Sequence, residues 1–291
     1  MTKLSTMSGA VPVRVVTYNV RYATKNPVSG EEPWTVRRSK LCAQMRFIAA
    51  GQSSVFFCLQ EVLYEQLNDI QDRLGSSWSH IGVGREDGDK AGEFSPIFFR
   101  SDHWTCERNK TYWLSETPEK PSKGWDAALE RIVTVGSFRH KKTGALAIIM
   151  ATHFDHAGKV AREESARLIV KLAGDWKSGS SEEAQAPLVL GGDFNSTPTD
   201  EAYKALTGPD TGMKDVSGLL PDDLKYGNHE ITYTSFGEPN ERPKRIDFLF
   251  VHESSNVKLL GFALLDNRHD DGVFLSDHRP VVLDLEIPGG K

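Results

Sequence analysis

The chain has 291 residues, a formal net charge of −5 and three cysteines, and 38% of its residues are hydrophobic. This fraction of hydrophobic residues is too high for an intrinsically disordered chain. Three scattered cysteines are too few for a disulfide framework or a cysteine-based zinc cluster. Lysine and arginine number 35 against 40 aspartates and glutamates, which disfavours a generally basic nucleic-acid-binding surface.

The first hundred residues alternate strand and helix patterns. Runs of β-branched and apolar residues predict strands at 13–20, 55–59 and 97–100. Apolar side chains spaced by three and four residues predict helices that begin near Trp34 and Leu63. The glycine- and aspartate-rich segment 81–90 predicts a loop.

The alternation continues to the end of the chain with longer loops. Segment 115–128 holds two prolines and few apolar residues, which predicts a long loop of the kind that is often functional. Strands are expected at 132–138, 145–154, 187–190, 245–251 and 280–285, with a helix at 160–173 and a surface loop at 179–187. We therefore expect one α/β domain over residues 13–287, preceded by a flexible N-terminus of residues 1–12.

Neither export nor membrane insertion is indicated. The longest apolar stretch, residues 145–151, is far shorter than the ~20 residues of a membrane helix, and the first residues lack the apolar run of a signal peptide. A low, odd number of cysteines is typical of a reducing compartment. We expect a cytoplasmic protein without a membrane partner.

Acids, amides and histidines follow several predicted strands abruptly. They are Asn19, Glu61, His153, Asp155, Asp193, Asn195, Asp247, Asp277 and His278. A carboxylate beside a buried strand is costly unless it is paired or holds a cation. Each residue taken singly fits a turn or a helix cap, although Asp247 stands in an apolar strand without turn residues around it. Their number favours a single oxygen-rich site.

Such a site has a recognisable chemistry. Carboxylate and amide oxygens suit Mg²⁺ or Mn²⁺ rather than zinc held by sulfur. Histidines beside them can donate hydrogen bonds to charge that develops on phosphoryl oxygens, and an aspartate can fix the tautomer of a histidine.

Six motifs in a fixed order resemble those of the endonuclease/exonuclease/phosphatase superfamily. They are Tyr18-Asn19, Leu59-Gln60-Glu61-Val62, Thr152-His153, Gly192-Asp193-Phe194-Asn195, Arg245-Ile246-Asp247 and Ser276-Asp277-His278. The resemblance covers almost the whole chain. It implies a four-layer α/β sandwich, in which two mixed, mainly antiparallel sheets pack face to face with helices outside. It also implies a metal-dependent hydrolase of phosphoester bonds.

The resemblance implies a role for each motif residue. Glu61 corresponds to the principal metal ligand, with Asn19 and Asp277 beside it, and the metal is expected to be Mg²⁺ or Mn²⁺. Asp193 corresponds to the residue that orients or deprotonates the attacking water. Asn195 corresponds to a phosphate or second-metal contact.

Two histidines complete the implied catalytic set. His278 corresponds to a phosphate-contacting or acid–base histidine, and Asp247 to the carboxylate that orients it. His153 corresponds to a further phosphate contact. All three residues lie in motifs that carry the resemblance.

The loops resemble those of a little-characterised bacterial and fungal branch. The likeness lies in segments 81–88, 92–94, 112–118 and 124–128, and loops usually select the substrate. The substrate-pocket candidates are Arg85, Glu93, Trp113, Asp126, Arg131 and Asp155. Trp113 can equally serve to pack its loop. The acidic residues of these loops weaken recognition of a DNA duplex, because carboxylates repel its backbone.

We therefore expect a monomeric metal-dependent phosphatase or phosphodiesterase that acts on a small phosphorylated molecule, sugar-like or lipid-like. Three alternatives stay open. One is a nuclease or DNA-repair phosphodiesterase, and another is a relative that uses the metal on a non-phosphate organic substrate. The third, a catalytically silent binding protein, is disfavoured because a scaffold does not require the complete motif set.

Overall fold

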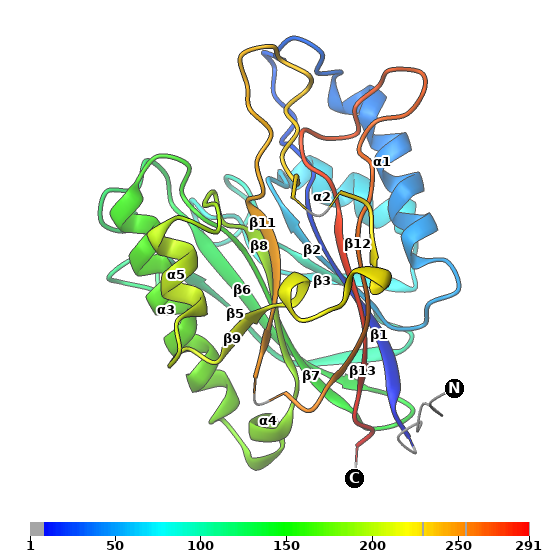
Figure 1. Ribbon diagram of the computed structural model, residues 1–291, viewed down its shortest axis with the longest axis vertical. Coiled ribbons are helices and arrows are strands. Elements are labelled where there is room, and N and C mark those ends of the chain that lie inside the picture. The colour runs from blue at the N-terminus through cyan, green and yellow to red at the C-terminus, as the bar shows by residue number, and fades with distance from the viewer. Residues whose placement is uncertain (1–8, 229, 254, 291) are drawn as a thin grey trace.

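Two β-sheets form the centre of the computed structural model, which describes residues 9–228, 230–253 and 255–290 (Figure 1). The seven-stranded sheet has the order β10 (Lys225–Tyr226), β12 (Lys258–Leu264), β13 (Val281–Ile287), β1 (Val11–Asn19), β2 (Val55–Gln60), β4 (Ile97–Arg100), β3 (Trp78–Ile81). The six-stranded sheet has the order β5 (Trp104–Trp113), β6 (Ile132–His140), β7 (Leu146–His153), β8 (Leu188–Asp193), β11 (Asp247–His252), β9 (Met213–Asp215).

Both sheets are mixed and mainly antiparallel. The parallel pairs are β1 with β2, β7 with β8, and β10 with β12. Parallel pairs need crossover connections, because the chain must return to the end of the sheet at which the first strand began before the second strand can run in the same direction. The helices are α1 (Trp34–Ala49), α2 (Tyr64–Leu74), α3 (Lys159–Lys177), α4 (Ser181–Gln185) and α5 (Glu201–Thr207), with short 3₁₀ turns η1 (Val216–Gly218) and η2 (Asp222–Leu224).

Three hydrophobic cores separate four layers. The middle core lies between the sheets and contains alternate residues of facing strands, such as Val15, Phe56 and Leu249. A second core joins α1 and α2 to the outer face of the seven-stranded sheet. A third joins α3 and α5 to the outer face of the six-stranded sheet. The expected four-layer α/β sandwich is therefore confirmed.

Most element boundaries differ little from the sequence expectations, and one expectation is wrong. Segment 179–187 was expected to be a loop but contains α4, because the Ser180 hydroxyl caps the helix by accepting a hydrogen bond from the Glu183 amide at 3.1 Å. Strand β1 begins at Val11, two residues earlier than expected. Of the segment expected to be flexible, residues 1–8 lie outside the described residues. Among the described residues, no helix is long and apolar enough to cross a membrane.

Candidate active site

The strand register brings the motif residues to one end of the sandwich. Asn19 ends β1 opposite Gln60 of β2, directly before Glu61. His153 ends β7 opposite Asp193 of β8, and Asp247 pairs with Asp193 from the other side. The two sheets meet here, since the Asn19 side-chain amide donates to Asp193 Oδ2 at 3.0 Å. This end lies away from the two termini in Figure 1.

Asp193 is the centre of the site. Its side chain is buried, and Oδ1 accepts the backbone N–H of Asn195 at 2.9 Å. Two imidazole nitrogens lie near Oδ2, His153 Nε2 at 3.5 Å and His278 Nε2 at 3.7 Å. Burial and the neighbouring charge of Asp247 raise the pKa of Asp193 to about 7. A carboxylate with such a pKa is suited to accept a proton at neutral pH.

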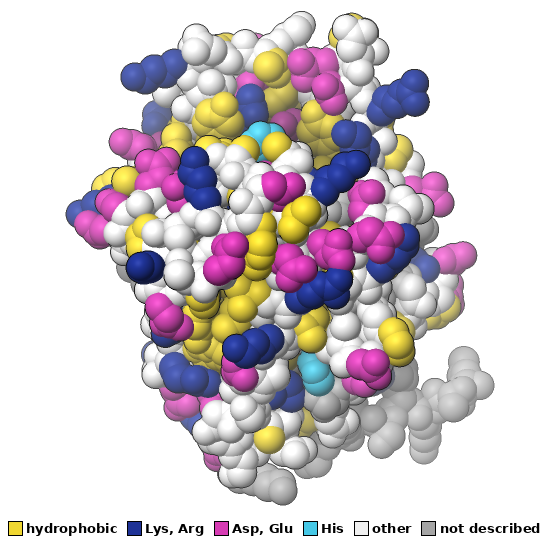
Figure 2. Space-filling model, turned by 90° about the vertical axis from the view of Figure 1, so that its left-hand side faces the viewer, with side chains coloured by type: hydrophobic (Ala, Val, Ile, Leu, Met, Phe, Trp, Pro, Cys, Tyr) yellow, Lys and Arg dark blue, Asp and Glu magenta, His cyan; other side chains and the backbone are white. Residues whose placement is uncertain are grey.

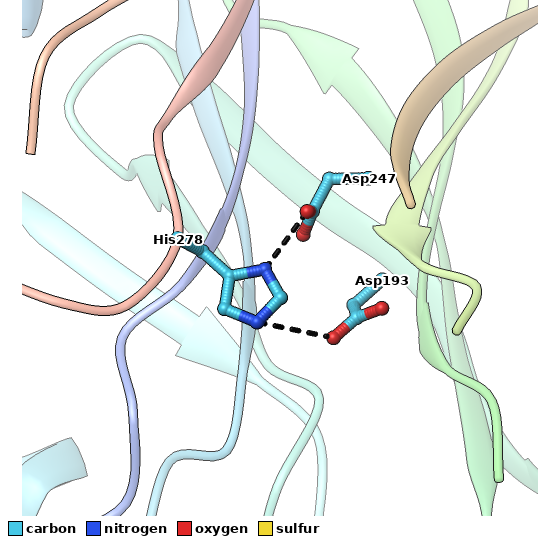
Figure 3. Close-up of side chains that lie close together, drawn as sticks. All are labelled: Asp193, Asp247 and His278. Carbon is cyan, nitrogen blue, oxygen red and sulfur yellow. Dashed lines mark hydrogen bonds and ion pairs between the residues drawn. The ribbon is translucent and has the colours of Figure 1, made fainter. Parts of the chain in front are cut away.

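His278 and Asp247 form a dyad beside Asp193 (Figure 3). The two side chains are buried, and His278 Nδ1 lies 2.8 Å from Asp247 Oδ2. Burial opposes protonation of His278, but the charges of Asp247 and Asp193 outweigh it and raise its pKa well above the usual value. The hydrogen bond through Nδ1 leaves Nε2 directed toward Asp193, so Nε2 is the nitrogen available for chemistry.

Glu61, Asn19 and Asp277 form a second group of polar side chains, which Asn19 joins to Asp193. The Asn19 amide donates to Glu61 Oε1 at 2.9 Å, and the Tyr22 backbone N–H donates to Oε2 at 3.1 Å. Burial opposes ionisation of Glu61, but the hydrogen bond from Asn19 and the charge of Arg21 lower its pKa. Burial and the charge of Glu61 raise the pKa of Asp277. The charge of one acid therefore opposes ionisation of the other, a conflict that a bound cation relieves.

Two donor sets can hold a divalent cation. Ligand atoms of Asp193, Asp247 and His278 lie within 4.8 Å of one another. Oδ1 of Asp247 is also buried without a hydrogen-bond partner. The predicted set of Glu61, Asn19 and Asp277 offers oxygens alone, the donors that Mg²⁺ prefers. Both sets fit a divalent cation by the chemistry of their donors.

Two motif residues of the site have strained backbones. Glu61 has φ 59° and Asn195 has φ 45°, which is uncommon for residues other than glycine. Such strain costs about 1–3 kcal/mol and is often found where a site fixes a side chain. Glu61 follows directly on the end of β2, and Asn195 lies two residues after the end of β8.

Asn195 fixes the orientation of His153. The Asn195 amide nitrogen contacts His153 Nε2 at 3.0 Å and donates to the Phe154 carbonyl at 3.0 Å. With a donor against Nε2, the proton of a neutral His153 belongs on Nδ1. Burial and the charge of Arg131 lower the pKa of His153 well below the usual value, which favours the neutral ring.

Arg85 and Glu93, two predicted pocket residues, lie beside His153. Arg85 Nη1 and Nη2 bind the two Glu93 carboxylate oxygens at 2.8 and 2.9 Å. Glu93 Oε2 lies 3.8 Å from His153 Nδ1. Burial and the charge of Glu61 raise the pKa of Glu93. The structure therefore brings this ion pair to the edge of the site.

The other four predicted pocket residues make contacts that support the loops. Trp113 Nε1 donates to the Arg85 carbonyl at 2.7 Å, and Asp126 accepts the Ala161 N–H of α3 at 2.6 Å. The Arg131 Nε–H donates to Asp155 Oδ2 at 3.3 Å. These contacts position the loops, and direct contact with a substrate remains a prediction for these residues.

Asp155 is expected to be important for stability. It accepts backbone N–H groups of Ala128, Leu129, Ala157 and Gly158 at 2.8–3.2 Å. We expect Asp155→Asn to lower the free energy of unfolding by about 3–5 kcal/mol at pH 7, because it leaves buried partners of the carboxylate unsatisfied. Urea denaturation measures this difference, with the exposed Asp175→Asn as control.

The loss of stability in Asp155→Asn should be larger at pH 7 than at pH 3. Burial opposes ionisation of Asp155, but the backbone hydrogen bonds outweigh it and lower its pKa. A lowered pKa stabilises the fold above the unfolded-state pKa of about 4, and the benefit fades as the pH falls below that value. The gap between wild type and Asp155→Asn should therefore narrow from pH 7 to pH 3, and a constant gap would contradict this assignment.

Sequence patterns did not point to two residues that the structure places around the site. The Tyr233 ring lies beside the His278 ring, with 5.1 Å between ring centroids. Arg37 of α1 is completely buried and donates to backbone carbonyls, among them Val20 at 2.9 Å and Leu275 at 2.7 Å. Arg37 thereby joins the loops that follow Asn19 and precede Asp277. No local signal reveals this, because the partners are distant in sequence.

Comparisons with known proteins identify chains of similar sequence and fold. Residues 16–278 match the model described as Endonuclease/Exonuclease/phosphatase family. A Bacteroides vulgatus endonuclease/exonuclease/phosphatase structure is 33% identical, with a TM-score of 0.83, and the match covers 95% of this chain and 99% of that one. A Bacteroides thetaiotaomicron mannosyl-6-phosphatase is 31% identical, with a TM-score of 0.82 and coverage of 94% and 99%.

A second Bacteroides thetaiotaomicron family protein is 30% identical, with a TM-score of 0.82, and the match covers 96% of this chain and 98% of that one. No curated protein matches the chain. The likeness extends over nearly the full length of each of these chains, so it spans both sheets.

Proposed function

This chain belongs to the endonuclease/exonuclease/phosphatase family and is a metal-dependent phosphoesterase hydrolase, and we propose that its substrate is a small phosphorylated sugar. The observation that carries the proposal is the buried Asp193, which has the Asp247–His278 dyad on one side and His153 on the other. The mannosyl-6-phosphatase among the similar structures supports a sugar phosphate in particular.

We propose that Glu61, Asn19 and Asp277 hold the cation, either Mg²⁺ or Mn²⁺. When bound, such a cation polarises a phosphoryl oxygen and lowers the pKa of a coordinated water. Asp193 takes the proton of the attacking water at Oδ2, the oxygen toward which both imidazoles and Asn19 point. Its raised pKa matches this task.

The remaining residues are proposed to bind the phosphoryl group and the sugar. His278, protonated and held through Nδ1 by Asp247, donates from Nε2 to charge that develops on a phosphoryl oxygen. Asn195 uses its amide nitrogen within the protein, which leaves its side-chain oxygen for a water or a sugar hydroxyl. The Arg85–Glu93 pair is proposed to bind hydroxyl groups of the sugar.

The described residues of the face drawn in Figure 2 offer no continuous basic surface to a nucleic-acid duplex. On the face drawn in Figure 2, lysines and arginines are interspersed with aspartates and glutamates, and no continuous basic band crosses the described residues of that face. Binding to a duplex depends on neutralising many phosphates in a row. A compact phosphoester needs only the local donors of the site.

A panel of substrates tests this proposal. Protein treated with EDTA should be inactive, and Mg²⁺ or Mn²⁺ should restore turnover of hexose 6-phosphates, because the metal activates both water and phosphate. Bis(p-nitrophenyl) phosphate and plasmid DNA serve as the comparison substrates. Faster cleavage of DNA than of any sugar phosphate, with steep loss at higher salt, would favour the nuclease alternative.

A further inference from the structure

Arg21 occupies a strained position beside the proposed metal ligands. Its φ is 58°, in the left-handed region that residues other than glycine rarely adopt. Its backbone N–H donates to Asn19 Oδ1 at 2.9 Å, and the next N–H, of Tyr22, donates to Glu61 Oε2 at 3.1 Å. The turn is therefore built into the site, and it directs the Arg21 side chain away from the extended path of β1.

The Arg21 guanidinium is fixed on several sides. Nε and Nη2 bind the two carboxylate oxygens of Glu31 at 3.0 and 3.1 Å, and the Glu31 side chain is only 1% exposed. The guanidinium also lies over the Tyr22 ring, 4.6 Å from its centroid. Arg37 Nη2 donates to the Arg21 carbonyl at 3.1 Å. A side chain held in this way loses little further entropy when it binds a ligand.

One nitrogen of the Arg21 guanidinium has no hydrogen-bond partner among the described residues. Nη1 of Arg21 makes no hydrogen bond to any described residue, and the side chain keeps 18% of its surface exposed. Both Glu61 and Asp277 lie near enough to interact electrostatically with Arg21. The positive charge of Arg21 thus acts on two proposed metal ligands, and its Nη1 is left without a hydrogen-bond partner among the described residues.

Arg85 and Arg131, two further arginines near the site, do not offer such a donor. Arg85 uses both terminal nitrogens on Glu93, and its Nε is buried. Arg131 binds Asp155 through Nε and His156 through Nη2, and its Nη1 is buried. Of the three guanidinium groups, Arg21 alone combines a carboxylate anchor with an accessible unpaired nitrogen.

We propose that Arg21 binds the phosphoryl group of the substrate through Nη1, donating to a non-bridging oxygen. The inference rests on the proposed phosphoester substrate. Guanidinium groups form strong charge-assisted hydrogen bonds with phosphate oxygens. In phosphoryl transfer, negative charge lies on the three equatorial oxygens, and a fixed cation stabilises it. Glu31 is then a positioning residue, because it holds the guanidinium without contacting the substrate.

Binding of inorganic phosphate to the Mn²⁺-saturated protein tests the proposal directly. We expect Arg21→Met to weaken phosphate affinity by about 10- to 100-fold in calorimetry, since a charge-assisted hydrogen bond is lost. Arg21→Lys keeps the charge but not the fork, and it should recover part of the affinity. Arg38→Met, a surface arginine of α1 paired with Asp69, is the control and should bind phosphate as wild type does.

A second variant guards against unfolding. Arg21→Met leaves the buried Glu31 carboxylate without its cation, whereas Arg21→Met/Glu31→Gln removes both charges and keeps an acceptor for the Val28 N–H. The double variant should therefore preserve the melting temperature while phosphate binding stays weak. Unchanged phosphate affinity in either variant, or no phosphate binding by wild type, overturns the role of Arg21. Phosphate binding that depends on Arg21, without turnover of any sugar phosphate, contradicts only the proposed substrate.

Discussion

Replacing Asp193 by asparagine is expected to lower kcat/KM by about 10²- to 10⁴-fold, the usual contribution of a general base. The asparagine keeps the size of the side chain and one acceptor oxygen, but it cannot take a proton from water. Oδ1 is needed for the Asn195 N–H, so the amide nitrogen would occupy the place of Oδ2, where both imidazoles now meet the carboxylate.

Steady-state kinetics on a sugar phosphate, together with Mn²⁺ titration and thermal melting, checks this expectation. Asp210→Asn makes the same substitution at an exposed aspartate and is the matched control. A loss of turnover with unchanged Mn²⁺ affinity identifies Asp193 as the base. Activity within tenfold of wild type would remove Asp193 from that role.

Replacing Glu61 by glutamine is expected to weaken Mn²⁺ binding by about 100-fold, because the number of charged ligands sets the affinity of oxygen sites for divalent cations. Glutamine retains the length of the side chain and can still accept one of the two hydrogen bonds from Asn19 and Tyr22. Turnover should fall at low Mn²⁺ and recover partly when Mn²⁺ is raised. Glu65→Gln, on the exposed first turn of α2, is the control.

The same titration on Asp247→Asn decides between the two donor sets. If Glu61, Asn19 and Asp277 hold the metal, Asp247→Asn loses activity through His278 but keeps its Mn²⁺ affinity within about threefold, since only the orientation of the imidazole changes. If Asp193, Asp247 and His278 hold it, Asp247→Asn weakens Mn²⁺ binding and Glu61→Gln does not.

Much of the fold followed from local patterns. The helices at Trp34–Ala49 and Tyr64–Leu74 match their apolar spacing, and the strand pair β6–β7 matches the two predicted runs. Strand β12 had no sequence prediction, because Gly261 interrupts its short apolar run and shifts the register within the strand. Helix α5 was also absent from the prediction, since seven residues are too short for a clear helical period.

The predicted pocket residues fall into two groups, those that lie beside the site and those that support its loops. Arg85 and Glu93 come to the site together, although nothing local distinguishes them from Asp126. Asp126 instead caps α3, which begins 33 residues later. An acidic residue in a loop can pair with a cation, cap a helix or bind a substrate, and the sequence alone does not distinguish these three roles.

By itself, the sequence determined which strands end in the acid, amide and histidine side chains of the candidate site, and in what order, because a strand end and the polar residue after it are local features. The tertiary structure alone decided what each of those side chains faces. Asn19 contacts Asp193 across 174 residues, and Arg37 binds the Leu275 carbonyl across 238. Asn19 and Asp193 meet because the two sheets pack face to face, whereas Arg37 and Leu275 meet because α1 packs on the seven-stranded sheet. Neither contact is encoded in the residues next to these positions.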